Sequence, residues 1–148
     1  MRLTLHTDYS LRVLMFAALK GETLSTIAEI AEHFDISRTH LMKIVNTLGR
    51  AGYLDTVRGK KGGFRLAKKP IQIKLGDVVR NLEEELAVVG CMQQSDYCPI
   101  EDACVLRRAL GEAMAAFLAV LDRYTLSDLV APRKSLARLL EIDALPAL

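Results

Sequence analysis

Two short helical patterns followed by a glycine-rich turn constrain the fold of this chain more than any other feature. Residues 26–33 and 38–51 both carry apolar side chains at helical spacing, and a three-residue turn at 34–36 separates them. Ser25 and Ser37 are the predicted N-caps of the two helices. Two short helices across such a turn are typical of a helix-turn-helix unit, whose second helix enters the major groove of DNA.

A predicted β-hairpin follows this unit directly. Strand-like runs at 53–58 and 64–67 flank the turn Gly59-Lys60-Lys61-Gly62-Gly63. Glycine permits the positive dihedral angles of a tight turn. A hairpin in this position is a wing. A phosphate-binding loop is a poor alternative, because the turn lacks the Gly-Lys-Ser/Thr ending and does not open a helix.

The longest helical pattern, 105–123, carries a near-heptad apolar stripe formed by Leu106, Leu110, Ala113, Phe117, Val120 and Leu121. Such a helix at the edge of a small domain usually packs on a partner helix, although it could instead cover its own domain. Other helices are expected at 8–20, capped by Thr7 or Asp8, and at 75–86. A linker strand is expected at 70–74, and a turn of helix at 126–130 should be followed by a partly ordered tail.

The predicted fold class is mainly α with a small β-hairpin: a winged helix-turn-helix DNA-binding domain plus a long dimerisation helix. We assign residues 1–80 to the DNA-binding domain, 81–104 to a cysteine-containing loop region, 105–130 to the dimerisation helix and 131–148 to a C-terminal tail.

Charge divides unevenly between the two halves of the chain. The net charge is only +2, but residues 1–80 carry 14 Lys and Arg against 7 Asp and Glu, whereas residues 81–148 carry 6 against 11. The first half is therefore expected to face a polyanion. No apolar run approaches the roughly 20 residues that a membrane span needs, and the N-terminus lacks a signal-peptide pattern, so a cytoplasmic protein is expected.

The candidate DNA contacts lie in two places. The start of the 38–51 helix presents Ser37, Arg38, Thr39, His40 and Lys43, and the wing presents Arg58, Lys60 and Lys61. Arginine can bind guanine through two hydrogen bonds, and the other side chains can donate to bases or phosphates. The wing cations suit phosphates or the minor groove.

Three cysteines fall within fourteen residues, at Cys91, Cys98 and Cys104. An odd number in a cytoplasmic chain argues against a disulfide framework. Zinc sites usually contain one pair spaced two to four residues apart, which is absent from this sequence. Three thiolates on one loop, with a fourth ligand elsewhere, can hold an iron–sulfur cluster. Reduced cysteines without metal remain an alternative.

These motifs together resemble the iron–sulfur winged-helix transcriptional repressors, and most closely the NsrR branch, which senses nitric oxide. The matching segments cover about residues 1–130: Leu3-Thr4, Thr7-Asp8-Tyr9, Leu11-Arg12, Ser37-Arg38-Thr39-His40, the wing from Val57 to Gly63, Gly76-Asp77-Val78-Val79-Arg80, the three cysteines, Tyr124-Thr125-Leu126 and Asp128-Leu129.

The resemblance implies a homodimer that binds an operator in double-stranded DNA and carries a four-iron four-sulfur cluster that supports this binding. Nitrosylation of the cluster would release DNA and derepress nitric-oxide detoxification genes. The branch that controls cluster assembly has a histidine where this chain has Arg107, which cannot ligate iron. The NsrR branch implies that Asp8 of the other subunit is the fourth ligand, although the sequence alone suggests a helix cap. Arg12, one helical turn after Asp8, is the predicted switch that pairs with Asp8 when the cluster is lost.

Other functions remain open at this stage. A regulator of the same fold could sense redox state or iron through a two-iron cluster, or a zinc-stabilised or metal-free module could bind DNA without sensing. An enzyme is the least favoured class, because His6, His33 and His40 are scattered and belong to no visible nucleophile–base arrangement.

Overall fold

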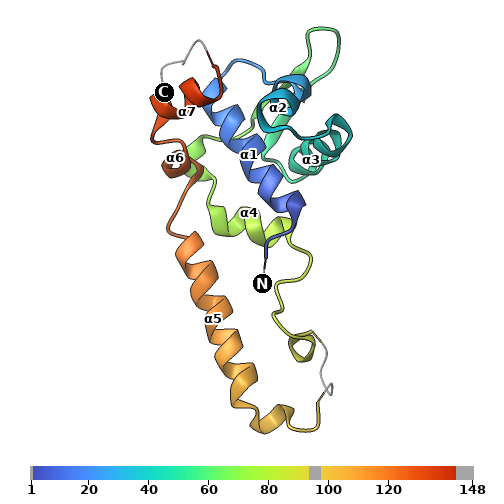
Figure 1. Cartoon of the computed structure of the whole chain (residues 1–148), viewed down its shortest axis with the longest axis vertical. Coiled ribbons are helices and arrows are strands. Elements are labelled where there is room, and N and C mark those ends of the chain that lie inside the picture. Colours follow the sequence, from blue (N-terminus) through green and yellow to red (C-terminus); the bar gives the residue numbers. More distant parts are fainter. Residues whose placement is uncertain (1, 94–97, 143–148) are drawn as a thin grey trace.

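The computed structural model describes residues 2–93 and 98–142, and in these ranges it is mainly helical with one two-stranded sheet (Figure 1). The helices are α1 (Leu5–Lys20), α2 (Ile27–Phe34), α3 (Arg38–Arg50), α4 (Leu75–Leu82), α5 (Val105–Leu121), α6 (Leu126–Leu129) and α7 (Arg133–Leu139). The strands are β1 (Leu54–Val57) and β2 (Gly63–Leu66), and single 3-10 turns occur at η1 (Pro70–Gln72), η2 (Gly90–Met92) and η3 (Glu101–Ala103).

Helix α1 lies at the centre of a body that contains both N-terminal and C-terminal elements, and it contacts α3, β2, α4 and α6. Its side chains Val13, Leu14, Phe16 and Leu19 are almost completely buried. Burial of one such side chain stabilises a fold by roughly 1.5–3 kcal/mol. The position of the helix-turn-helix unit is therefore fixed by its packing on α1.

Two helices begin at different residues from those predicted. Thr4, rather than Thr7 or Asp8, caps α1, and its own N–H and hydroxyl donate to Glu83 at 2.8 and 3.0 Å. Thr26, rather than Ser25, caps α2. Ser25 is buried and instead exchanges two backbone hydrogen bonds with Phe64 of β2. The predicted helix at 75–86 ends at Leu82, and η1 occupies most of the predicted linker strand.

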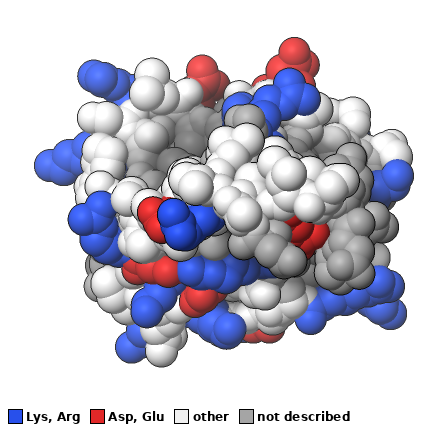
Figure 2. Space-filling view, turned by 90° about the horizontal axis from the view of Figure 1, so that it is seen from below, with Lys and Arg blue, Asp and Glu red and all other residues white. Residues whose placement is uncertain are grey.

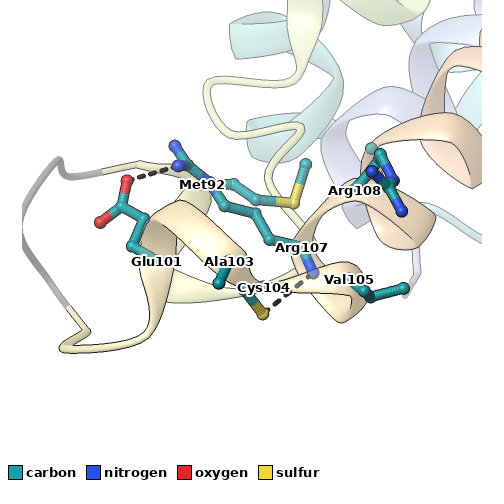
Figure 3. A pocket seen from close by; sticks show the side chains of 8 residues that line it. Met92, Glu101, Ala103, Cys104, Val105, Arg107 and Arg108 are labelled. Atoms are coloured by element: carbon teal, nitrogen blue, oxygen red, sulfur yellow. Dashed lines mark hydrogen bonds and ion pairs between the residues drawn. The ribbon is translucent and has the colours of Figure 1, made fainter.

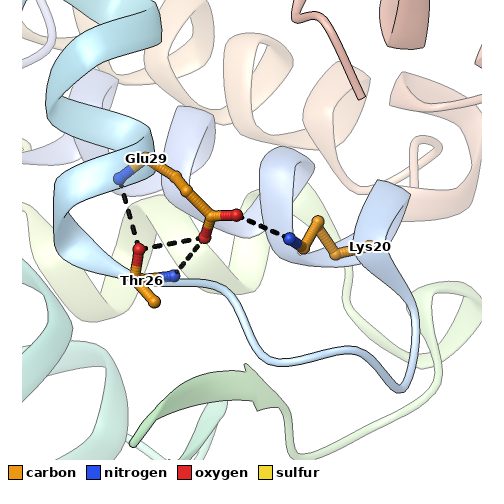
Figure 4. A network of polar contacts seen from close by, with 3 residues as sticks. All are labelled: Lys20, Thr26 and Glu29. Carbon is orange, nitrogen blue, oxygen red and sulfur yellow. Dashed lines mark hydrogen bonds and ion pairs between the residues drawn. The ribbon is translucent and has the colours of Figure 1, made fainter. Parts of the chain in front are cut away.

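The start of α2 is held against α1 by a small polar network (Figure 4). Glu29 accepts hydrogen bonds from the Thr26 N–H at 2.8 Å and from Lys20 Nζ at 2.7 Å, while the Thr26 hydroxyl oxygen accepts from the Glu29 N–H. Partial burial would raise the pKa of Glu29, but the hydrogen bonds from Lys20 and Thr26 outweigh it and hold the pKa below its usual value. A cap of this kind stabilises a helix by about 1 kcal/mol.

The predicted wing is present and is tied to the body. Strands β1 and β2 pair antiparallel, and Phe64 of β2 fills the core. Gly59 has a φ of +115°, which L-residues with a side chain rarely adopt. At Gly62 an added Cβ would collide with the Val57 carbonyl oxygen, so the tight turn also requires glycine there.

An arm that ends in α5 projects from the body (Figure 1). At its junction with the body, Arg80 of α4 donates two hydrogen bonds, at 2.7 and 2.6 Å, to the carboxylate of Asp122, the C-cap of α5. A Cβ at Gly76 would overlap this carboxylate, so the Asp122 side chain packs directly over α4 at this glycine. Within α5, all of whose residues are described, Met114 is the only buried side chain. No helix in residues 2–93 and 98–142 is long and apolar enough to cross a membrane.

Candidate DNA-binding face and cysteine site

The outward face of α3 is polar and cationic. The Ser37 hydroxyl caps the helix by accepting from the His40 N–H at 3.3 Å, as predicted, and Ser37, Arg38, Thr39 and Lys43 are all exposed. Leu41, Ile44, Val45 and Leu48 fill the opposite, buried face. The α3 sequence contains no acidic residue. This arrangement leaves the first two turns of α3 free to enter a major groove.

His40 is the exception among the predicted contacts on α3. It is half-buried, and its ring meets the Tyr9 ring of α1 edge-on, with 5.2 Å between ring centroids, and lies 6.4 Å from the ring of His6. His40 therefore links the start of α3 to the start of α1. Its role as a base contact remains a prediction.

Three exposed side chains of α3 were missed by the sequence prediction: Met42, Asn46 and Arg50. They follow Arg38 and Thr39 at intervals of three to four residues, so they continue the same face along the helix. The helical periodicity that located the buried stripe could have identified them.

The wing places Arg58, Lys60 and Lys61 in exposed positions around the glycine turn. Viewed from the end of the arm, the surface shows both signs of charge interspersed, with many Lys and Arg side chains projecting at the outer edge (Figure 2). Charges of both signs therefore mix at the end of the arm, whereas α3 carries no acidic residue.

All three cysteines are free and half-buried, and all lie on the arm. Cys91 belongs to η2, Cys98 precedes η3, and Cys104 is the N-cap of α5. The Cys104 sulfur accepts from the Arg107 N–H at 3.4 Å. The N-terminus of a helix favours negative charge, so this position suits a thiolate.

A cavity of about 530 Å³ opens beside Cys104 (Figure 3). Met92, Arg107 and Arg108 line it together with Glu101, whose carboxylate forms an ion pair with the Arg107 guanidinium. The second oxygen of Glu101, Oε2, is buried with no hydrogen-bond partner in the described part of the chain. Arg107 therefore holds the segment between Cys98 and Cys104 against the start of α5.

The donor set suits an iron–sulfur cluster, since three reduced thiols share one segment and one of them caps a helix. The described residues of a single chain do not bring three His, Cys, Asp or Glu side chains together as a metal site. Of the carboxylates near the cysteines, Glu101 is paired with Arg107, and Asp96 lies outside the described residues.

Asp8 lies in the first turn of α1, which belongs to the body, whereas the cysteines of its own chain lie on the arm (Figure 1). Its carboxylate pairs with Arg12 at 2.8 Å. The Arg12 guanidinium also lies 5.5 Å from the Tyr9 ring centroid and 5.9 Å from that of Phe34. Asp8, Arg12, Tyr9 and His40 thus form a continuous set of contacts from α1 to α3.

Comparison with known proteins settles the family. The model of the Rrf2 family, described as iron-dependent transcriptional regulators, matches residues 3–132. The chain belongs to the Rrf2 family. The HTH-type transcriptional regulator NsrR of Bacillus subtilis (strain 168) is 46% identical over 144 residues, which cover 96% of this chain and 99% of the relative. NsrR of Geobacillus kaustophilus (strain HTA426) is 50% identical over 143 residues, covering 95% and 97%.

Solved structures of this Rrf2-family fold agree. CymR, the global cysteine regulator of B. subtilis, superposes with a TM-score of 0.70 at 27% identity, over 88% of this chain and 97% of CymR. IscR of T. potens gives a TM-score of 0.72 at 26% identity, over 92% and 90%. The predicted resemblance, winged-helix fold class and non-enzymatic character are confirmed, and this Rrf2-family chain is a DNA-binding transcriptional regulator.

Replacing Arg58 or Lys61 with alanine should weaken DNA binding for many sequences alike. Each lost phosphate contact should reduce the slope of log affinity against log salt by about 1. Titration of duplexes at several salt concentrations measures this slope. Lys134→Ala in α7, which removes the same charge from an exposed site away from α3, is the matched control. Unchanged slopes in both wing variants would remove the wing from the interface.

Proposed function

We propose that this Rrf2-family protein is a homodimeric repressor that senses nitric oxide through an iron–sulfur cluster of the four-iron four-sulfur type. The observation that carries the proposal is the placement of three free thiols on the arm beside the exposed helix α5, while α3 and the wing lie on the body. Sensing and DNA binding thus have separate places in the chain. The NsrR relatives, at 46% and 50% identity, support the assignment to the nitric-oxide-sensing branch.

Cys91, Cys98 and Cys104 would hold the cluster, and Asp8 of the partner subunit would complete it. Soft thiolate ligands suit iron–sulfur clusters, and a single carboxylate is a harder and weaker ligand for the remaining iron. When bound, the cluster would supply iron that reacts with nitric oxide. Arg107 supports the site without ligating iron, because its guanidinium is fixed on Glu101 and its N–H donates to Cys104.

The partner subunit is the better source of the fourth ligand, because Asp8 and the cysteines of one chain lie apart. Dimerisation through α5 would allow Asp8 of one subunit to reach the cysteines of the other. Its apolar stripe is largely uncovered in the single chain: Leu106 and Val120 are exposed, and Phe117 is half-buried. A symmetric pairing of two such helices buries the same residues from both chains.

The contacts of Asp8 provide a route to α3. When the Asp8 carboxylate binds the cluster of the other subunit, Arg12 loses it as a partner. When the cluster is lost, Asp8 pairs with Arg12, as it does in the structure. Arg12 packs over Tyr9, and Tyr9 contacts His40 in the first turn of α3. A shift of α1 would therefore move the recognition helices of the dimer. Half-sites one DNA turn apart tolerate little change in their spacing.

Replacing Asp8 with asparagine should keep a cluster but change its visible spectrum and its reactivity, because one iron loses an anionic ligand. The measurement is the absorption spectrum of anaerobically purified protein. Asp55→Asn, at an exposed position, is the matched control.

The colour of the parent protein tests the cluster type. A straw-brown parent indicates four irons. A redder one indicates the two-iron cluster of a redox or iron sensor, which would overturn the four-iron assignment.

Heterodimers test the cross-subunit part separately. When one chain carries Asp8→Asn and the other Cys98→Ala, both defects fall on the same site if Asp8 acts across the dimer. The second site then has all its ligands and should show the parent spectrum. A remaining cluster that resembles the Asp8→Asn homodimer would mean that Asp8 acts within its own chain.

A further inference from the structure

The exposed face of α3 carries one large apolar side chain, that of Met42. Its surface is 53% exposed, although the other large apolar residues of this helix are buried in the core. All residues of α3 are described. On a helix of 3.6 residues per turn, Met42 lies four residues after Arg38 and four before Asn46, so it occupies the middle of the outward face.

Its neighbours identify the surface that would cover Met42. Arg38 lies one turn before it, Lys43 is the next residue, and Arg50 continues the exposed face about two turns further, while Thr39 and Asn46 add neutral hydrogen-bonding groups. A cationic rim with a polar and apolar middle complements nucleic acid, because phosphates meet the cations and base edges meet the centre. A protein partner would be a poorer match, since interface cores are depleted of charge.

The base that matches an unbranched apolar side chain is thymine. In the major groove each base pair presents a different pattern of hydrogen-bond donors and acceptors. The 5-methyl group of thymine is the apolar group among the base edges there. Methionine is flexible and polarisable, so its thioether can follow such a group closely. Arg38 and Asn46 offer the polar counterpart, because arginine pairs with guanine and asparagine with adenine.

We propose that Met42 is a specificity-determining residue that contacts the 5-methyl group of one thymine in each half-site of the operator. The inference rests on the proposed entry of α3 into the major groove. Thr39 and Lys43 then position the helix on either side of this contact, and the base preference at that position depends on an apolar side chain rather than on a hydrogen bond.

The test replaces thymine with deoxyuridine, which lacks only the methyl group. A duplex is first selected from a random-sequence pool with the full-length, anaerobically purified protein. Each thymine of that duplex is then replaced singly, at symmetric positions. Burial of one methyl group corresponds to about a fourfold change in affinity. The parent should lose about fourfold per half-site at one symmetric pair of positions, and Met42→Ala should lose nothing further there.

Two further variants separate this contact from general damage. Met42→Leu keeps an apolar side chain and should retain the dependence on the methyl group. Leu139→Ala removes another exposed apolar side chain, on α7, and should behave as the parent. The proposal would be overturned if Met42→Ala lost as much affinity as the parent at every thymine replaced by deoxyuridine. It would also be overturned if the parent lost affinity at none of these positions. A selection that enriches no sequence would overturn DNA recognition through α3 as well.

Discussion

Replacing Cys98 with alanine should abolish the iron and sulfide bound by the protein. Loss of an outer-shell partner already costs roughly 10–100-fold in metal affinity, and a missing thiolate ligand should cost at least as much. The same result is expected for Cys91 and Cys104, because the chain contains no other thiol that could replace one of them. Iron and sulfide analysis after anaerobic reconstitution measures the effect.

A sulfur-containing neighbour provides the matched control for the cysteine variants. Met92 lines the cavity beside Cys104, but a thioether is not expected to ligate this cluster. Met92→Leu should therefore bind iron and sulfide at the level of the parent. A full cluster in any single cysteine variant would remove that residue from the site.

Replacing Phe117 with aspartate should convert the proposed dimer into monomers. The side chain is half-buried in the single chain and belongs to the apolar stripe of α5. Loss of apolar burial costs roughly 1.5–3 kcal/mol for each chain, and a carboxylate in an apolar interface adds to that cost. Twofold symmetry applies the penalty twice. Sedimentation should then show monomers that bind one half-site weakly.

The opposite face of α5 provides the control for this variant. Ala119 is exposed and lies two residues, or about 200° around the helix, from Phe117. Ala119→Asp introduces the same charge and should sediment as a dimer. A monomeric parent, or a dimeric Phe117→Asp variant, would contradict the assignment of α5 as the dimer interface.

The helix-turn-helix unit and the wing could be predicted because their signals are local. Ser37 caps α3 as expected, and the glycines of the wing turn are required by a positive φ and by close backbone contacts. Such features depend on residues within a few positions, so sequence periodicity and turn chemistry are sufficient to locate them.

The two cap errors have different causes, one distant and one local. Helix α1 begins at Leu5 because Thr4 is held by Glu83, which lies 79 residues away in the chain. Glu83 cannot be located from the spacing of apolar residues. At α2, Thr26 is the cap because it forms a capping box with Glu29, a local pattern that the prediction overlooked, while the backbone groups of Ser25 pair with Phe64 of the wing.

The candidate site also has features that the sequence could predict and features that it could not. The sequence indicated that the cysteines share a loop, and the structure places all three on the arm. From the sequence, Arg107 was predicted only to be unable to ligate iron. In the structure, its ion pair with Glu101 gives Arg107 a structural role. His40 was expected to face outward, but its contact with Tyr9 depends on how α1 packs on α3.

The affinity of anaerobically purified protein for its selected duplex, measured before and after stepwise addition of nitric oxide, tests the central claim most directly. Coupling between two sites typically amounts to 5–150-fold in affinity. We expect a loss of DNA affinity in this range that follows the loss of the cluster absorption, while Cys98→Ala binds weakly and does not respond. Unchanged DNA affinity after the cluster absorption has disappeared would contradict the account.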